Sequence, residues 1–255
     1  MDLYTLETGR PGQPAVVLLH GGGLSSKMWQ PVVEMLPDYH ILAPDLPEQG
    51  RSQEIGPFTL EDSARRVAEL IRQRVPGGTA HVVGLSLGGA VTLTLLRLAP
   101  EVIDRALVTG TAAVLDRWLG RLSLASLGVL RLYKVETLAE MTLKQQGIPA
   151  QYRDLVFPDL AATATESFNR TTIQALMDMQ LPLQNSRPLL AMVGSKETPT
   201  AKAAARKLVR TLPNTTGAMV PGLNHVWPLQ DPGLFCRVLR AWTGGEPLPE
   251  ELSGL

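Results

Sequence analysis

The sequence predicts an α/β fold of three layers, in which helices cover both faces of a mostly parallel sheet. Two observations lead to this fold class. Short apolar segments rich in β-branched residues, such as residues 15–19, alternate along most of the chain with segments of helical periodicity. Strands that are separated by helices pair in parallel, and a parallel sheet needs helices on both of its faces.

Six segments have the composition of buried strands. They are residues 15–19, 40–44, 80–83, 105–109, 188–193 and 216–220. Helical patterns at 29–35, 59–74 and 87–98 lie between the first four of these strands. Thr59 can cap the second of these helices, and Asp62 lies near the positive end of the same helix.

One long segment interrupts this alternation. Between residues 112 and 185 the sequence has helical patterns only, at 119–132, 135–146 and 171–179. A helical block of this length, inserted after the fourth predicted strand, is typical of a cap over a site, although such helices can also complete a core. We therefore expect a helical cap of residues 112–185, inserted in a core domain of residues 1–111 and 186–255.

Composition limits the classes of partner. Lys plus Arg equals Asp plus Glu, at 24 each, and no dense basic cluster is present, so a nucleic-acid partner is not expected. No apolar run approaches the roughly 18 residues of a membrane span, and the first residues lack the pattern of a signal peptide. The one cysteine, Cys236, excludes an intrachain disulfide and is expected to be buried, which fits a cytoplasmic protein.

The segment Gly84-Leu85-Ser86-Leu87-Gly88 carries the most specific signal, because it directly follows a predicted strand and precedes a predicted helix. A residue on such a tight turn has strained backbone geometry, and a glycine on each side allows the turn to form. The turn would raise the Ser86 hydroxyl above the sheet edge, beside the positive end of the following helix. We therefore expect Ser86 to be a nucleophile.

A serine hydroxyl needs a general base to take its proton, and the chain has four histidines. His40 and His81 lie at the start of or inside predicted strands, and His20 is placed to brace the following glycine loop by hydrogen bonds. His225 follows the last predicted strand, at the sheet edge where parallel sheets bind ligands. His225 is therefore the predicted general base.

The base in turn needs an acid that sets its tautomer and stabilises the imidazolium. Glu197 follows the fifth predicted strand and precedes His225, which agrees with a serine, acid, histidine order along the chain. We expect Glu197 to be this acid. Asp116, just after the fourth predicted strand, is the alternative, and Asp178 lies less favourably in a helical pattern.

The oxyanion of a tetrahedral intermediate needs fixed N–H donors. The backbone N–H of Leu87 is predicted to supply one, and the glycine loop after the first predicted strand supplies the other at Gly22. Candidate substrate-binding residues are Gly21, Gly23, Leu24 and Trp227. The glycines lack the pattern of a P-loop or of a dinucleotide fingerprint, so we expect no cofactor, and we expect no metal.

Together these motifs resemble the α/β-hydrolase superfamily, in particular its serine esterases and lipases with a helical cap. The resemblance covers nearly the whole chain, through residues 18–23, 29, 44–47, 50–52, 84–89, 194–197 and 222–225. It implies an eight-stranded sheet, although the short N-terminal segment leaves room for only one strand before residue 15. Two positions depart from the family pattern. Gln49 stands where histidine is usual between two glycines, and Glu197 stands where aspartate is usual.

The predicted function is hydrolysis of a carboxylic ester of a small or acyl-chain substrate, through an acyl-enzyme intermediate. The apolar sequence of the predicted cap favours an acyl chain or another small apolar group. The same residue set also serves C–C bond hydrolases, amide hydrolases, lyases and perhydrolases of the superfamily, and a slow-turnover ligand receptor can retain it. These alternatives stay open, as does the choice between a monomer and a homodimer.

Overall fold

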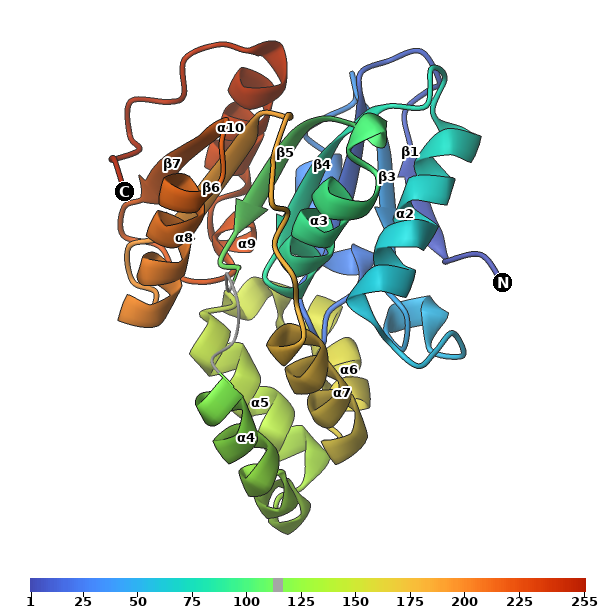
Figure 1. Ribbon diagram of the computed structural model, residues 1–255. Helices are drawn as coiled ribbons and strands as arrows, with labels where there is room; N and C mark the ends of the chain where they lie inside the picture. Colours follow the sequence, from blue (N-terminus) through green and yellow to red (C-terminus); the bar gives the residue numbers. More distant parts are fainter. Residues whose placement is uncertain (112–116) are drawn as a thin grey trace.

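A seven-stranded sheet forms the centre of the computed structural model, which describes residues 1–111 and 117–255 (Figure 1). The strand order is β1-β3-β2-β4-β5-β6-β7; β1 pairs antiparallel with β3, and the other neighbours are parallel. The strands are β1 (Thr5–Thr8), β2 (Ala15–Leu19), β3 (His40–Pro44), β4 (Ala80–Leu85), β5 (Ile103–Thr109), β6 (Leu189–Gly194) and β7 (Thr215–Val220). The predicted fold class is confirmed, and β1 is the single strand before residue 15.

The central strands are buried on both faces, which explains why their sequences are continuously apolar. In β2, Val17 and Leu19 enter one hydrophobic core together with side chains of α2 (Leu60–Arg74), α3 (Leu87–Leu98) and α8 (Pro199–Thr211). Val16 and Leu18 enter a second core with side chains of α1 (Gln30–Val33), α9 (Trp227–Gln230) and α10 (Pro232–Gly244). Helices therefore cover both faces of the sheet, as Figure 1 shows.

Helix α2 begins where its sequence predicts. The hydroxyl oxygen of Thr59 accepts a hydrogen bond from the backbone N–H of Asp62 at 3.0 Å, which satisfies one of the free donors of the first turn. Asp62 and Glu61 also place negative charge at the positive end of the helix. This hydrogen bond from Asp62 to Thr59 thus fixes the first residue of α2, which packs directly on α3.

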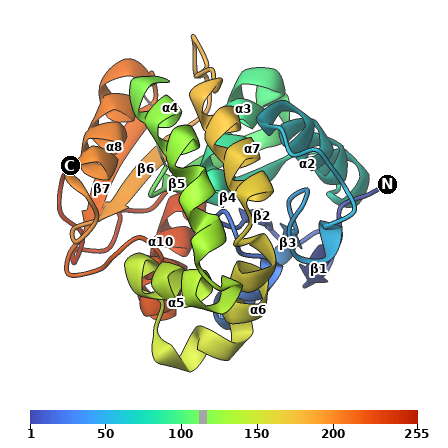
Figure 2. The same cartoon turned by 90° about the horizontal axis from the view of Figure 1, so that it is seen from below.

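Within the described residues, four helices lie between β5 and β6: α4 (Arg117–Ser126), α5 (Val135–Gln146), α6 (Arg153–Thr163) and α7 (Glu166–Met177). A 3₁₀ segment, η4 (Leu127–Leu132), follows α4. Figures 1 and 2 show these helices beyond the carboxyl ends of the strands, with α4 packed on α7 and α5 on α6. The sequence patterns did not predict α6, which contains Pro158 in its interior. None of the described helices is long and apolar enough to cross a membrane.

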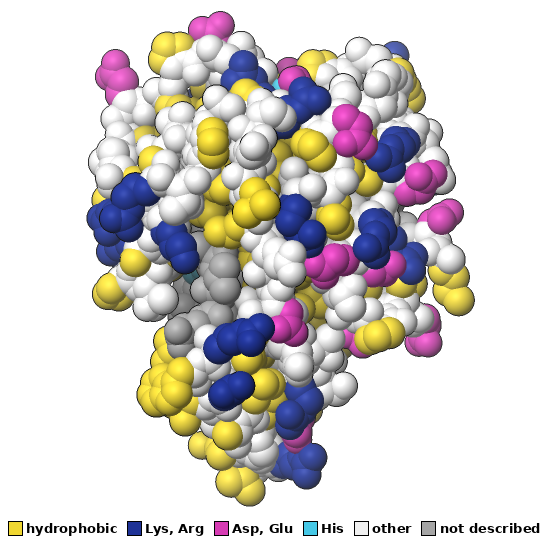
Figure 3. Space-filling view, viewed as in Figure 1, with side chains coloured by type: hydrophobic (Ala, Val, Ile, Leu, Met, Phe, Trp, Pro, Cys, Tyr) yellow, Lys and Arg dark blue, Asp and Glu magenta, His cyan; other side chains and the backbone are white. Residues whose placement is uncertain are grey.

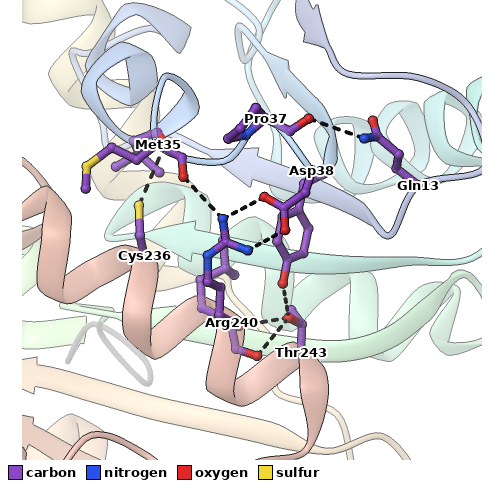
Figure 4. A network of polar contacts seen from close by, with 10 residues as sticks. Gln13, Met35, Pro37, Asp38, Cys236, Arg240 and Thr243 are labelled. Carbon is purple, nitrogen blue, oxygen red and sulfur yellow. Dashed lines mark hydrogen bonds and ion pairs between the residues drawn. The ribbon is translucent and has the colours of Figure 1, made fainter.

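The C-terminal helix α10 is fixed to the segment before β3 (Figure 4). The Arg240 guanidinium donates to both carboxylate oxygens of Asp38, and the hydroxyls of Tyr39 and Thr243 lie 2.8 Å apart. Cys236 on the same helix is buried, and burial raises the pKa of its thiol to about 11. The thiol is therefore protonated at neutral pH and packs as a small apolar group, as predicted.

Candidate active site

Ser86 lies on a turn between β4 and α3 that only a strained backbone can make. Its φ is +53°, in a region that non-glycine residues rarely adopt, and it is the residue that directly precedes α3. The backbone N–H of Ser86 donates to the carbonyl oxygen of Thr109 at the end of β5 (2.8 Å). The residue is thus tied to the neighbouring strand and faces the positive end of a helix of 12 residues.

The glycines on either side of Ser86 have no room for a side chain. A Cβ added to Gly84 would lie 2.3 Å from the carbonyl oxygen of Gly88, and one added to Gly88 would lie 2.4 Å from the carbonyl oxygen of Leu19. Backbone atoms of β2, of β4 and of the start of α3 therefore approach one another directly around the turn. This close approach is the physical reason for the glycine spacing seen in the sequence.

His225 and Glu197 form the ion pair or hydrogen bond that the sequence predicts between them. The Nδ1 atom of His225 lies 2.7 Å from Oε2 of Glu197, and Oε1 of Glu197 accepts the backbone N–H of Gly194 at 3.0 Å. The Glu197 side chain is buried, whereas a quarter of the His225 side chain is exposed. Because an ionised carboxylate only accepts hydrogen bonds, the proton of a neutral His225 lies on Nδ1 and Nε2 is left as the basic nitrogen.

Backbone hydrogen bonds join the loops that carry this pair. The N–H of Ser195 donates to the carbonyl oxygen of Val220 (2.8 Å), and the N–H of Lys196 donates to that of Leu223 (2.9 Å). The hydroxyl oxygen of Ser195 accepts the N–H of Gly222 at 2.7 Å. The loops after β6 and β7 are therefore bonded along their length, which places Glu197 beside a histidine 28 residues further along the chain.

Gly110, which the sequence analysis did not single out, lies against the His225–Glu197 pair. Its φ is +62°, and an added Cβ would lie 2.7 Å from both Nδ1 and Cε1 of His225 and 3.3 Å from Oε2 of Glu197. The preceding residue, Thr109, accepts the hydrogen bond from Ser86. The end of β5 therefore contacts the predicted nucleophile and the predicted base within two consecutive residues. The available sequence signal was a glycine directly after a strand.

The glycine loop after β2 is held by Gln49, one of the two departures from the family pattern. The side-chain oxygen Oε1 of Gln49, which is fully buried, accepts the backbone N–H of Gly23 at 2.9 Å. The N–H of Gly23 is thus engaged within the protein. A Cβ on Gly22 would be in ordinary contact with Leu87, at 3.5 Å. The structure therefore brings Gly22 and Leu87, the two predicted oxyanion donors, next to each other.

His20 braces the same loop, as the sequence predicts. Its Nε2 accepts the backbone N–H of Leu46 at 2.9 Å, so Nε2 carries no proton and Nδ1 donates to the carbonyl oxygen of Gly21, also at 2.9 Å. The ring is fully buried, and this desolvation lowers the pKa of His20 below its ordinary value of 6.5. His20 is therefore a neutral link between the loops after β2 and β3.

A buried carboxylate on α6 connects the inserted helices to the glycine loop. Oδ2 of Asp159 accepts the hydroxyl of Ser25, and Oδ1 lies 3.0 Å from the ammonium nitrogen of Lys27. One turn along α6, the hydroxyl of Thr163 lies 3.0 Å from where a Cβ of Gly23 would be. Asp159 could not be predicted from the sequence, because no local pattern relates a helix position to a loop 134 residues earlier.

The remaining candidates lie in or near the core. Trp227 is fully buried, donates from Nε1 to the hydroxyl oxygen of Thr109 at 2.7 Å and packs against Phe235, while Leu24 is buried among the apolar side chains of the same core. Contact of either residue with a substrate stays a prediction. Asp116, the alternative acid, lies outside the described residues. Among the described residues, no three His, Cys, Asp or Glu side chains are grouped so that they could hold a metal ion.

Comparisons with known proteins show which family this chain resembles in sequence and fold. A sequence model described as the alpha/beta hydrolase family matches residues 16–238. An AB hydrolase superfamily protein of Gibberella zeae is 39% identical over 102 residues, which are 39% of this chain and 36% of that protein, so the match spans little more than a third of that relative. The pimeloyl-[acyl-carrier protein] methyl ester esterase of Pectobacterium atrosepticum is 26% identical over 246 residues, 90% of this chain and 94% of that protein. An esterase structure from Exiguobacterium antarcticum has a TM-score of 0.81 at 19% identity, with 95% of each chain covered.

We expect Gly110→Ala to destabilise the fold and to displace His225. Gly77→Ala is the matched control, because Gly77 also has a positive φ (+84°) but has no atom within 4 Å of an added Cβ. The control should lose about 1 kcal/mol of unfolding free energy from backbone strain alone, and Gly110→Ala should lose about 1–3 kcal/mol more from the clash. Urea unfolding and the NMR signal of the His225 Nδ1 proton measure the two effects. Equal losses with an unchanged proton signal would contradict the contact.

We expect the His20 ring to stay neutral at pH values where an exposed histidine takes up a proton. The folded pKa lies below the unfolded value, so the unfolded chain binds more protons as the pH falls through about 6.5. The stability from neutral His20 is therefore complete above that pH and is lost as the pH decreases. The NMR signal of the His20 Cε1 proton should not titrate between about pH 8 and pH 6. A titration midpoint near 6.5 in the folded protein would show that the two hydrogen bonds are wrong.

Proposed function

The chain belongs to the alpha/beta hydrolase family, and we propose that it is a serine hydrolase that cleaves carboxylic esters through an acyl-enzyme intermediate. One observation carries the proposal. Ser86, on its positive-φ turn, and the His225–Glu197 pair both contact the Thr109–Gly110 end of β5. The similarity to a relative named as a methyl ester esterase supports ester cleavage as the reaction.

In the first half of the proposed reaction, Ser86 Oγ attacks the ester carbonyl carbon while Nε2 of His225 takes the hydroxyl proton. Glu197 holds the ring through Nδ1 and stabilises the imidazolium that forms. The negative charge moves to the carbonyl oxygen, where the N–H groups of Gly22 and Leu87 would receive it. When the C–O bond breaks, the imidazolium returns its proton to the leaving alkoxide, and the acyl group remains on Ser86.

In the second half, a water molecule replaces the alcohol. Nε2 of His225 takes a proton from the water, whose oxygen attacks the acyl carbon and forms a second tetrahedral oxyanion. Collapse of this intermediate breaks the bond to Ser86 Oγ, which recovers its proton from His225. The products are one alcohol and one carboxylic acid, and the protein returns to its starting state without a cofactor.

We also propose that residues 112–185 act as a cap on a core formed by residues 1–111 and 186–255. The hydrogen bond from Ser25 to Asp159 supports the cap role, because it holds an inserted helix against the glycine loop that carries Gly22. The apolar composition of the inserted helices favours a substrate with an acyl chain or another small apolar group. We propose that the floor of the substrate-binding region under this cap is formed by Gly21, Gly23, Leu24 and Trp227.

Ser86→Ala should abolish hydrolysis in a panel of p-nitrophenyl esters from acetate to palmitate. We expect kcat to fall on the order of 10⁴-fold or more, because no other group supplies the nucleophile. Ser126→Ala, at an exposed position on α4, is the control and should retain wild-type turnover. The chain length with the highest kcat/KM then defines the acyl pocket. If wild type shows no turnover of any ester but is stabilised by a bound ligand, the protein is a receptor instead.

Glu197→Gln should reduce kcat on the order of 10⁴-fold, the loss expected when the acid of a triad can no longer hold the reactive tautomer. Asp116→Asn should leave kcat within a few-fold of wild type. Both variants keep the shape of the side chain, and kcat with the best ester of the panel compares them directly. The reverse result, with Asp116→Asn inactive and Glu197→Gln active, would assign the acid to Asp116.

A further inference from the structure

The segment of residues 117–134, which comprises α4 and η4 and is called the basic tip below, differs in charge from the rest of the chain. The whole sequence has equal numbers of acidic and basic residues. The basic tip has no acidic residue, and its four charged residues are all cations: Arg117, Arg121, Arg131 and Lys134. Positive charge is therefore concentrated on the basic tip. Its elements α4 and η4 pack on α7 (Figure 1).

Apolar side chains are exposed on the same segment. Of the twelve large hydrophobic side chains exposed among the described residues, six belong to the basic tip: Trp118, Leu119, Leu122, Val129, Leu132 and Tyr133. Leu132 is 81% exposed and Trp118 is 69% exposed. Figure 3 shows hydrophobic side chains over this lower part of the molecule, with Lys and Arg side chains beside them. A patch of this kind marks an interaction surface.

The geometry of α4 places two of these residues, Trp118 and Leu122, on the solvent side of the helix. An added Cβ on Gly120 would lie 2.3 Å from the sulfur of Met177, so the Gly120 side of α4 packs closely on α7. At about 100° per residue, Trp118 and Leu122 fall on the opposite side of the helix. A surface helix normally has polar residues on that side. Helix α4 is therefore apolar both where it packs and where it faces solvent.

Two cations of the basic tip have no ion-pair partner within the part of the chain that the structure describes. Arg131 pairs with Glu166 at 2.7 Å, and Arg117 lies 3.8 Å from Asp178. Arg121 and Lys134, in contrast, have no carboxylate within 4.0 Å among residues 1–111 and 117–255. The surface thus combines cations that no described carboxylate pairs with and exposed aliphatic and aromatic side chains.

We propose that the basic tip binds peripherally to an anionic membrane surface. Leu122, Leu132 and the aromatic residues Trp118 and Tyr133 would enter the boundary between headgroups and acyl chains, as in amphipathic helices that lie on membranes. The ammonium of Lys134 and the guanidinium of Arg121 would face lipid phosphates. A second copy of the chain fits this surface less well, because both sides of a symmetric interface would carry the same excess of positive charge.

Flotation with phospholipid vesicles tests the proposal. Wild-type protein should float with vesicles that contain about one-third phosphatidylglycerol in phosphatidylcholine, should bind pure phosphatidylcholine at least tenfold more weakly, and should lose binding as salt increases. The double variant Leu122→Ser/Leu132→Ser should reduce the partition coefficient about tenfold or more. Arg121→Gln/Lys134→Gln should reduce it about fivefold for each charge removed.

Matched variants elsewhere on the surface distinguish this site from general adhesion. Leu183 is 97% exposed outside the basic tip, and Arg206 and Lys207 are exposed cations on α8. Leu183→Ser and Arg206→Gln/Lys207→Gln should float like wild type. Losses equal to those of the basic-tip variants would overturn the proposal. An unchanged melting temperature of each variant shows that the fold is retained.

Two further outcomes separate this proposal from its alternatives. Wild-type protein that does not float with the anionic vesicles contradicts membrane binding. If it instead sediments as a dimer that Leu122→Ser/Leu132→Ser converts to a monomer, the apolar surface is an interface between two copies. Ser86→Ala protein should float like wild type, so that failure of the esterase proposal and failure of membrane binding are seen independently.

Discussion

The positive φ of Ser86 is the constraint on which the rest of the site depends. A non-glycine residue in this conformation is held at a cost on the order of 1–3 kcal/mol, and it persists only where the surroundings determine it. Here the surroundings are backbone atoms. The turn between Gly84 and Gly88 lies directly against the backbone of Leu19, and the carbonyl oxygen of Thr109 accepts the Ser86 N–H. The geometry is therefore set by main-chain contacts between three adjacent strands, and a side chain at Gly84 or Gly88 would break them.

The parallel sheet explains how distant segments meet at this turn. Strands β2, β4, β5, β6 and β7 all end at the same edge, and each is followed by a loop that contributes to the site. Hydrogen bonds between loops then fix their relative positions: Ser195 and Lys196 bond to the chain after β7, and His20 joins the loop after β2 to Leu46. Convergence of the site is thus a property of the topology, and its precision comes from these bonds.

The parts of the site that could be predicted from the sequence have local signals. A glycine-flanked serine between a strand and a helix is one, and a histidine just after the last strand is another. The positions that could not be predicted depend on contacts between distant segments. Gly110 leaves room for the ring of His225, and Gln49 accepts the N–H of Gly23; no local pattern contains either contact. Helix α6 was missed for a related reason, since Pro158 interrupts its pattern and packing compensates.

Helices α6 and α4 differ in how they are attached to the rest of the fold. The difference follows from a buried charge on α6. The carboxylate of Asp159 is buried and receives both the Ser25 hydroxyl and the Lys27 ammonium, so separating α6 from the glycine loop would leave a buried charge without partners. Helix α4 packs on α7 and η4, with its outer side apolar and exposed. Because α6 holds the loop that carries Gly22, a displacement of α6 would move the proposed oxyanion donor, whereas α4 can bind a surface while the site keeps its geometry.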